Sequence, residues 1–343
     1  MSWKIKSLIA GLAFAASFGT AFADGELNIY NWGNYTSPDL IKKFEAKYNV
    51  KVTLTDYDSN DTALAKIRAG GHGFDIVVPS ANFVPIWIKE GLLLESRPDQ
   101  MENFKNMDER WIKVNWDLGR HYTVPWQWGI TGPVVDTAIY KGDINTSAIW
   151  LDPPPELVGK IDVVPEMNDV LYAAIRYEGG TWCTGDKGVL KKVLDQLKAA
   201  KPKWLAMDYG IEKFDTGDYK AALYYNGAAY RARQITKTVR FGFPKEGYSI
   251  FMDNVAVLKD AKNVENAKLF QNFIMDPENA ALISNFATYA NGIKGSEKFM
   301  KDGLKDAPEL NVPAELQAAG GWQDVCPTDV NDVYTKIWKE LLK

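Results

Sequence analysis

The sequence predicts an α/β protein built from two lobes, and three observations lead to this fold class. Residues 27–88 alternate between strand and helix patterns three times, which is the order of a parallel sheet covered by helices. A second α/β unit follows over residues 136–240. About 320 of the 343 residues remain once an N-terminal export segment is set aside, and that length exceeds what one hydrophobic core usually serves.

The first 23 residues are predicted to be a secretory signal peptide. Lys4 and Lys6 give this segment a positive start, residues 8–18 are apolar, and residues 21–23 (AFA) form a small-x-small cleavage site. The apolar run is too short and wrongly flanked for a membrane span. We therefore expect the mature protein to be exported and soluble.

The charge of the mature chain argues against a nucleic-acid partner. Removal of the two signal-peptide lysines leaves 38 basic and 44 acidic side chains, a net charge of −6. Tryptophan is abundant, with 12 in the whole sequence. Such residues serve core packing, but they also suit a ligand cleft built from flat aromatic rings.

The stretch LNIYNWGNYTSP contains the first strand and the loop after it. Residues 27–32 alternate as a strand, and Ser37 and Pro38 then supply an N-cap and a first helical residue. In an open α/β sheet, ligands lie beyond the carboxyl ends of the strands. A ligand site and simple rim packing of the aromatic residues explain this loop equally well. The loop residues at issue are Trp32, Asn34 and Tyr35.

The rest of the first lobe repeats this pattern. We expect a helix from residue 38 to about 47 and a second one between the polar loop at 56–61 and the glycines at 70–73. Strands are expected at 50–54 and 74–78. Ser80 and Asn82 follow the third strand. They share a sheet edge with the first loop, so the two loops form one candidate site.

The second lobe is reached through residues 122–136, which are predicted to form a pair of short strands around a glycine break. A return crossing is expected at residues 251–257. The remaining predicted elements are a strand at 161–164, helices at 168–177 and 187–199, a strand ending in a loop at 221–230, a hairpin and return strand at 241–258, helical residues 264–285, a loop at 286–293 and a helix at 330–342.

Cysteine and histidine give no catalytic or metal site. Cys183 and Cys326 permit one disulfide in an oxidising compartment, and two free thiols remain equally open. His72 and His121 each stand alone, without a second ligand at metal-binding spacing, and are interpreted as surface or loop residues. We therefore predict no catalytic residue, no cofactor and no metal.

Five segments in order carry a family resemblance: IYNWGNYTSP, FDIVVPSANF, VPWQWGITG, FPKEGYSIFMDNVAV and TYANG. Together they resemble the periplasmic polyamine-binding proteins, the putrescine/spermidine receptors of ABC importers. The resemblance covers nearly all of the mature chain. It implies a bilobal periplasmic-binding-protein fold of type II, in which a two-crossing hinge joins the lobes and lets them close on a ligand. We expect lobe 1 at residues 24–130 and 255–305, and lobe 2 at 131–254 and 306–343.

The resemblance also implies which residues bind the ligand. A polyamine is a thin apolar rod with ammonium groups, so its site needs carboxylates for the charges and aromatic faces for the methylenes. Asp253 could instead make structural hydrogen bonds, and Asp169 could be a first-turn helix acid. The implied positions are Trp32, Asn34, Tyr35, Ser80, Asp169, Tyr225, Ala228, Phe251, Asp253 and Tyr289.

Two departures from the family pattern affect the expected ligand. The resemblance implies an acid at the positions of Asn34 and Ala228, so two carboxylates are missing. Arg231 and Arg233 follow closely, and either would repel a polyamine and bind a ligand carboxylate if it faced the cleft. A solvated helix face explains them as well. We expect a polyamine or polyamine-like amine, with a zwitterionic amine or opine-type amino-acid derivative as the alternative.

The remaining expectations follow from the same resemblance. We expect a periplasmic monomer that binds its ligand without chemistry and docks on an ABC permease in the inner membrane. Two further readings stay open. Tyr224 and Tyr225 could serve a ferric-ion receptor, although neighbours on a strand face opposite ways. Cys183 could be an enzyme nucleophile, since thiamine-cleaving enzymes resemble these receptors, but no activating base lies beside it in the sequence.

Overall fold

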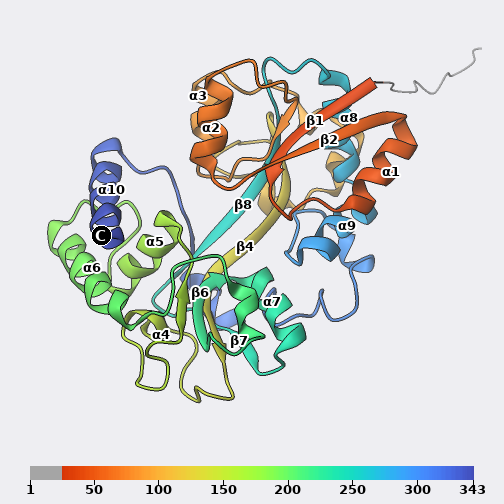
Figure 1. The fold of residues 1–343 in the computed structure, drawn as a ribbon. Coiled ribbons are helices and arrows are strands. Elements are labelled where there is room, and N and C mark those ends of the chain that lie inside the picture. Colours follow the sequence, from red (N-terminus) through yellow and green to blue (C-terminus); the bar gives the residue numbers. More distant parts are fainter. Residues whose placement is uncertain (1–24) are drawn as a thin grey trace, which may run out of the picture.

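The computed structural model describes residues 25–343, apart from the side chain of residue 212. The predicted signal peptide lies outside these described residues. Figure 1 shows two α/β lobes, with strands β4 (Thr123–Asp136) and β8 (Tyr248–Val257) passing from one to the other. Among the described helices, none has the length and apolar character needed to cross a membrane.

The strands form one continuous hydrogen-bonded sheet in the order β2-β1-β3-β8-β4-β6-β5. In lobe 1, β1 pairs in parallel with β2 and β3, and in lobe 2, β5 pairs in parallel with β6. The antiparallel pair β4–β8 joins these two parallel parts. The other strands are β1 Gly25–Trp32, β2 Val50–Tyr57, β3 Ile76–Val77, β5 Ile161–Val163, β6 Ala221–Tyr225, β7 Val239–Phe241 and β9 Gly320–Trp322.

The helices cover this sheet lobe by lobe (Figure 1). Lobe 1 carries α1 Pro38–Tyr48, α2 Asn60–Arg68, α3 Val84–Lys89, α8 Val264–Ile274 and α9 Pro277–Ala287. Lobe 2 carries α4 Ala148–Leu151, α5 Met167–Tyr177, α6 Lys187–Ala200, α7 Asn226–Ile235 and α10 Thr328–Leu342. The predicted start of α1 is confirmed, because the Ser37 hydroxyl accepts a hydrogen bond from the backbone N–H of Leu40 at 3.3 Å.

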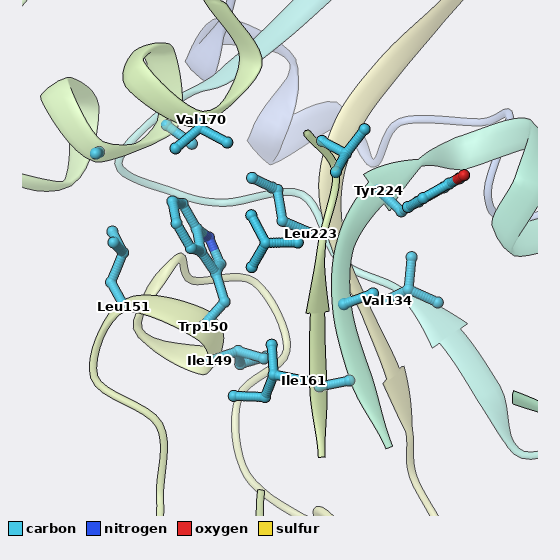
Figure 2. Packing of buried hydrophobic residues seen from close by; sticks show 14 of the residues in the cluster. Val134, Ile149, Trp150, Leu151, Ile161, Val170, Leu223 and Tyr224 are labelled. Atoms are coloured by element: carbon cyan, nitrogen blue, oxygen red, sulfur yellow. The ribbon is translucent and has the colours of Figure 1, made fainter. Parts of the chain in front are cut away.

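Each lobe has its own hydrophobic core. In lobe 2, Trp150 and Leu223 pack with Val170 between the sheet and its helices (Figure 2). In lobe 1, the buried residues come from residues 27–126 and 252–293. The lobe boundaries given above stay a prediction.

The structure corrects the prediction of two short strands at residues 122–136. β4 is one strand that continues through Gly129. A Cβ atom at Gly129 would lie 2.5 Å from the Phe251 ring and 2.7 Å from Asn226 Oδ1. The glycine therefore allows a close approach by its neighbours, and it does not end the strand.

Two further predictions are wrong in their local structure. Residues 221–230 form strand β6 and then the first half of helix α7, where a loop was expected. The expected hairpin at residues 241–258 does not form, because β7 and β8 both pair with β4. The predicted helical character of residues 264–285 is confirmed, with a break before Pro277, where Asp276 caps a second helix.

Cys183 and Cys326 form a disulfide bond, with their Cα atoms 5.0 Å apart. The bond ties the segment after β9 to the loop between α5 and α6, and it closes a chain segment of 143 residues. The question that the sequence left open is therefore answered in favour of pairing.

Loss of this disulfide should destabilise the protein. Replacing both residues (Cys183→Ser with Cys326→Ser) frees a long loop in the unfolded chain, and removing such a bond typically costs about 2–4 kcal/mol. Urea unfolding of the oxidised mature protein and of the double variant measures the difference. Equal unfolding free energies would contradict this role of the bond.

Candidate ligand-binding site

The floor of the candidate site is one face of the β4–β8 pair. Gln127 pairs with Asp253, Gly129 with Phe251 and Thr131 with Ser249. Directly opposed residues on antiparallel strands point to the same side. The side chains of these three pairs therefore share a face that extends from lobe 1 to lobe 2.

Asp253 is held from the lobe 1 side of this face. Its carboxylate accepts hydrogen bonds from the Ser80 hydroxyl at 2.7 Å and the Tyr35 hydroxyl at 2.9 Å. Asn60 in turn donates to the Ser80 hydroxyl at 3.0 Å. The side chain is only 5% exposed. The first-loop and third-strand residues of the sequence prediction thus meet at one carboxylate.

Asp169 is held from the lobe 2 side. It lies in the first turn of α5, and its Oδ1 atom accepts hydrogen bonds from Thr131 at 2.8 Å and Gln323 at 2.7 Å. Ser249 donates to the same oxygen at 3.2 Å, while the Tyr225 hydroxyl donates to Oδ2 at 3.3 Å. Asp169 is 9% exposed.

Aromatic rings lie between the two carboxylates. Phe251 is the central ring, with its centroid 5.5 Å from that of Tyr225 and 5.8 Å from that of Tyr289. Tyr289 also contacts Tyr35, at 5.9 Å. Asp253 and Ser249, which mark the two ends of this arrangement, are four residues apart on β8, a distance of about 13 Å along a strand.

The structure brings together seven of the ten implied positions, leaves Trp32 and Asn34 apart from them, and buries Ala228 in α7. The Trp32 indole donates to the carbonyl of Val78 at 3.0 Å and packs on Tyr57. Asn34 is exposed, with a left-handed backbone (φ 54°). Within residues 25–343, no hydrogen bond or ring contact joins either of them to Asp253 or Asp169.

Sequence reasoning missed the residues that donate hydrogen bonds to Asp169, and it also missed two neighbours of the carboxylates, Gln127 and Glu166. Thr131, Ser249 and Gln323 reach it from three strands or strand ends, and only the strand register identifies them. Gln127 is fully buried beside Asp253, and its amide nitrogen and oxygen have no hydrogen-bond partner among the described residues. Glu166 lies three residues before Asp169, and its carboxylate accepts a hydrogen bond from the Tyr209 hydroxyl.

Burial makes these carboxylic acids weak. It raises the pKa of Asp253 to about 6, the Asp169 carboxylate adds to the shift, and the hydrogen bonds from Ser80 and Tyr35 oppose it. Burial likewise raises the pKa of Asp169 against its four hydrogen-bond donors. Burial also raises the pKa of Glu166 to about 7. Burial therefore disfavours the ionised form of each carboxylic acid, and a bound cation would stabilise it.

The two arginines of α7 contact protein groups in different ways. Arg233 forms an ion pair with Glu309, whose side chain is 1% exposed. Arg231 donates to the Ala287 carbonyl at 2.8 Å and the Thr288 hydroxyl at 2.9 Å, at the end of α9. The charge of Arg233 is therefore paired. Arg231 is exposed and donates only to neutral groups, and its guanidinium carbon lies 6.0 Å from the ring centroid of Tyr289.

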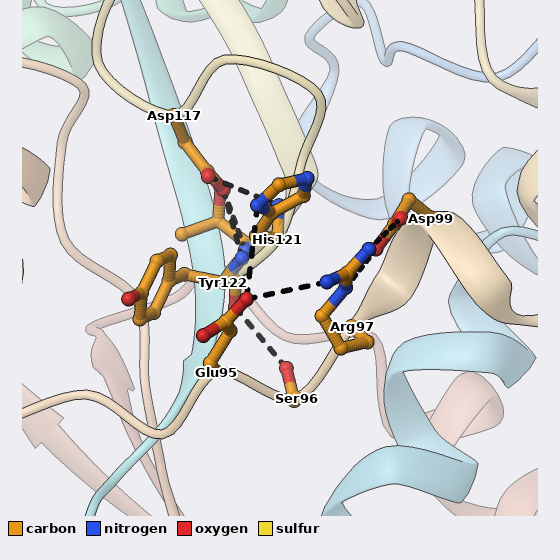
Figure 3. Close-up of polar contacts among 8 residues, drawn as sticks. Glu95, Ser96, Arg97, Asp99, Asp117, His121 and Tyr122 are labelled. Atoms are coloured by element: carbon orange, nitrogen blue, oxygen red, sulfur yellow. Dashed lines mark hydrogen bonds and ion pairs between the residues drawn. The ribbon is translucent and has the colours of Figure 1, made fainter.

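The two histidines and the adjacent tyrosines do not gather into a metal site. His121 pairs with Glu95 at 3.7 Å beside the start of β4, where Asp117 accepts three backbone N–H bonds (Figure 3). Tyr224 packs in the lobe 2 core (Figure 2), while Tyr225 points to Asp169. Across the described chain, no cluster of three or more His, Cys, Asp or Glu side chains could hold a metal ion.

Comparison with known proteins gives a consistent family. The family model of bacterial extracellular solute-binding proteins matches residues 39–312. The chain is 28% identical to the spermidine/putrescine-binding periplasmic protein of Salmonella typhimurium, over 99% of this chain and 98% of that protein. It is also 28% identical to the putrescine-binding periplasmic protein SpuD of Pseudomonas aeruginosa, over 97% and 94%.

A solved structure agrees. The TpPotD lipoprotein of Treponema pallidum superimposes with a TM-score of 0.80 at 25% identity, and the match covers 92% of this chain and 99% of that one. The bilobal α/β architecture expected from the sequence is thereby confirmed.

The Arg233–Glu309 pair should matter for stability and not for ligand binding. Arg233→Ala removes the cation beside a buried carboxylate, and we expect a loss of about 3 kcal/mol, the lower end for breaking a buried pair, because Arg233 is partly exposed. Arg240→Ala, at an exposed arginine, is the matched control. Urea unfolding measures both. A variant at position 233 as stable as the control would contradict the assignment.

Proposed function

The chain belongs to the family of bacterial extracellular solute-binding proteins, and we propose that it is the periplasmic receptor of an ABC importer for a small amine of the polyamine class. The relatives named above bind spermidine or putrescine, which supports this ligand class. The proposal adds that Asp253 and Asp169 bind the ammonium groups.

The observation that carries the proposal is a pair of buried carboxylates without a cation. Ser80 and Tyr35 donate to one, and Thr131 and Gln323 are among the donors to the other. Within the described chain, no lysine or arginine pairs with Asp253 or Asp169, and a buried charge lacking an opposite charge costs several kcal/mol, roughly. An ammonium ion at each carboxylate supplies the missing charge.

The rings between the carboxylates suit the middle of such a ligand. Phe251, Tyr225 and Tyr289 present apolar surface to a chain of methylene groups, and an ammonium over an aromatic face adds about 0.5–2 kcal/mol. A rod with a charge at each end thus matches an arrangement with a carboxylate at each end.

We infer lobe closure from the fact that the two carboxylates are oriented by residues of different lobes. Tyr35 and Ser80 orient Asp253 from lobe 1, while Tyr225 and Gln323 orient Asp169 from lobe 2. A ligand that bridges the carboxylates gains all of its contacts only when the lobes are together, so it shifts the population to the closed form. We propose that this form, as a monomer, docks on the inner-membrane permease.

The alternative ligands receive less support. A zwitterionic or opine-type ligand needs a cation for its carboxylate, but Arg233 is paired with Glu309 and Arg231 donates to the end of α9. A thiol-dependent enzyme needs a free thiolate, but Cys183 is in a disulfide. We therefore propose binding without catalysis.

Asp253→Asn should greatly weaken amine binding. Ser80 and Tyr35 donate to different oxygens of Asp253. The amide oxygen of Asn still accepts from one of these hydroxyls and the amide NH2 donates to the other, so the fold is kept while the charge is lost. Removing one partner of a buried charge pair costs about 2–5 kcal/mol, which is roughly thirty-fold or more in Kd.

Calorimetric titration with putrescine measures this effect on the mature, ligand-stripped protein. Asp302→Asn, at an exposed loop residue, removes the same charge and should leave Kd unchanged. Equal affinity of the Asp253→Asn variant and the wild type would remove Asp253 from the site.

Amine affinity should fall in acid. The pKa of Asp253 is about 6, and its proton has to leave before an ammonium ion binds the carboxylate. Affinity should decrease as the pH is lowered through 6, approaching about ten-fold per pH unit below that value. Asp169 and Glu166, whose pKa values are also raised, act in the same direction.

Titrations at several pH values between 5 and 8, in buffers of different ionisation enthalpy, check both the affinity and the proton released. An affinity that stays level or rises from pH 7 to pH 5 would contradict the ionised form of Asp253 as the ammonium partner.

A further inference from the structure

A cavity of about 240 Å³ lies beside the candidate site, at the outer edge of β8. On that edge, β9 pairs with β8 as far as Ile250, and Ser80 next bridges to Asp253. The cavity lies along β8 between the end of β9 and Ser80. Its lining includes Ser80 and Phe251, which also belong to the candidate site, and Gln323, which donates to Asp169.

Both lobes build the walls of this cavity. Lobe 1 contributes Asn82 and Pro85 near the start of α3, and the loop before β4 contributes Trp116. Lobe 2 contributes Trp322, whose ring contacts that of Trp116 with centroids 4.8 Å apart. The cavity is therefore complete only when the lobes are together.

Asp324 is the one formally charged side chain in the lining of this cavity. Its Oδ1 atom accepts a hydrogen bond from Asn115 of the opposite lobe at 2.8 Å, and no lysine or arginine of the described chain pairs with it. The other lining groups are apolar or neutral polar. A cavity with one carboxylate, aromatic walls and amide side chains suits an ammonium group on a methylene chain.

The segment that carries Asp324 is fixed in place. The Trp182 indole donates to the Asp324 carbonyl at 2.8 Å, and the Cys183–Cys326 disulfide holds the chain two residues later. Asp324 is exposed, but its backbone is anchored, so its carboxylate loses less freedom on binding a cation than one on a mobile loop would.

We infer that Asp324 and this cavity form an outer ammonium subsite, so that the receptor accepts a polyamine with a charged group beyond those bound by Asp253 and Asp169. This inference rests on the proposed function and names the longer members of the amine class as ligands. The ligand passes Gln323, which donates to Asp169 and also lines the cavity, so the third ammonium lies beyond the Asp169 end of the site. Asp324 thereby replaces charge that the family pattern places elsewhere, at the positions of Asn34 and Ala228.

The test compares spermidine, a triamine, with N-acetylspermidine, in which an amide replaces one terminal ammonium. Asp324→Asn keeps an oxygen that accepts from Asn115 and removes only the charge. We expect this variant to bind spermidine about ten-fold more weakly than the wild type, the effect of one charge-assisted hydrogen bond. Its preference for spermidine over at least one of the two acetylated isomers should shrink by the same factor.

Asp332→Asn is the matched control, because it removes an exposed charge from the same C-terminal segment outside the cavity. It should bind spermidine as the wild type does. An Asp324→Asn variant within about five-fold of the wild type, or a loss shared by the control, would overturn the subsite while leaving the proposed function intact. A wild type that binds neither putrescine nor spermidine would instead refute the proposed function, and the subsite with it.

Discussion

The antiparallel pair β4–β8 is the constraint on which the rest of the structure depends. These two strands run through both lobes, and their pairing fixes the lobe 1 sheet against the lobe 2 sheet. The same pairing sets which side chains share a face, so hinge and site are one piece of structure. Gly129 illustrates the coupling, because its missing side chain leaves room for the ring of Phe251 at the centre of the site.

Electrostatics then determine what the site can bind. The protein holds two carboxylates in low exposure and orients them with neutral donors, six in all, without supplying a cation. Nearby arginines are engaged by Glu309 and by the end of α9. The proposed selectivity for cations over zwitterions rests on the two acids and on the pairing of Arg233 with Glu309. Asn34 and Ala228 are neutral, but the candidate site still contains the two buried carboxylates of Asp253 and Asp169.

Local signals in the sequence predicted much of the fold. The Ser37 cap, the Pro38 helix start and the alternation in β1 depend on neighbours in the chain, and all three are found. Contacts set by distant pairing were beyond such signals. Thr131 and Ser249 become partners of Asp169 only through the register of β4 with β8. Gly129 looks like a strand break in the sequence, because its close neighbour Phe251 is known only from the structure. The sequence therefore predicted two short strands where β4 is one. Likewise, the number of cysteines allowed the disulfide but could not establish it.

A crystal structure of the mature protein with putrescine tests the central claim most directly. The account predicts closed lobes, the two nitrogens at hydrogen-bond distance from the carboxylates of Asp253 and Asp169, and the methylene chain against Phe251. A putrescine molecule bound elsewhere, or in the cleft with neither carboxylate in contact, would contradict the account.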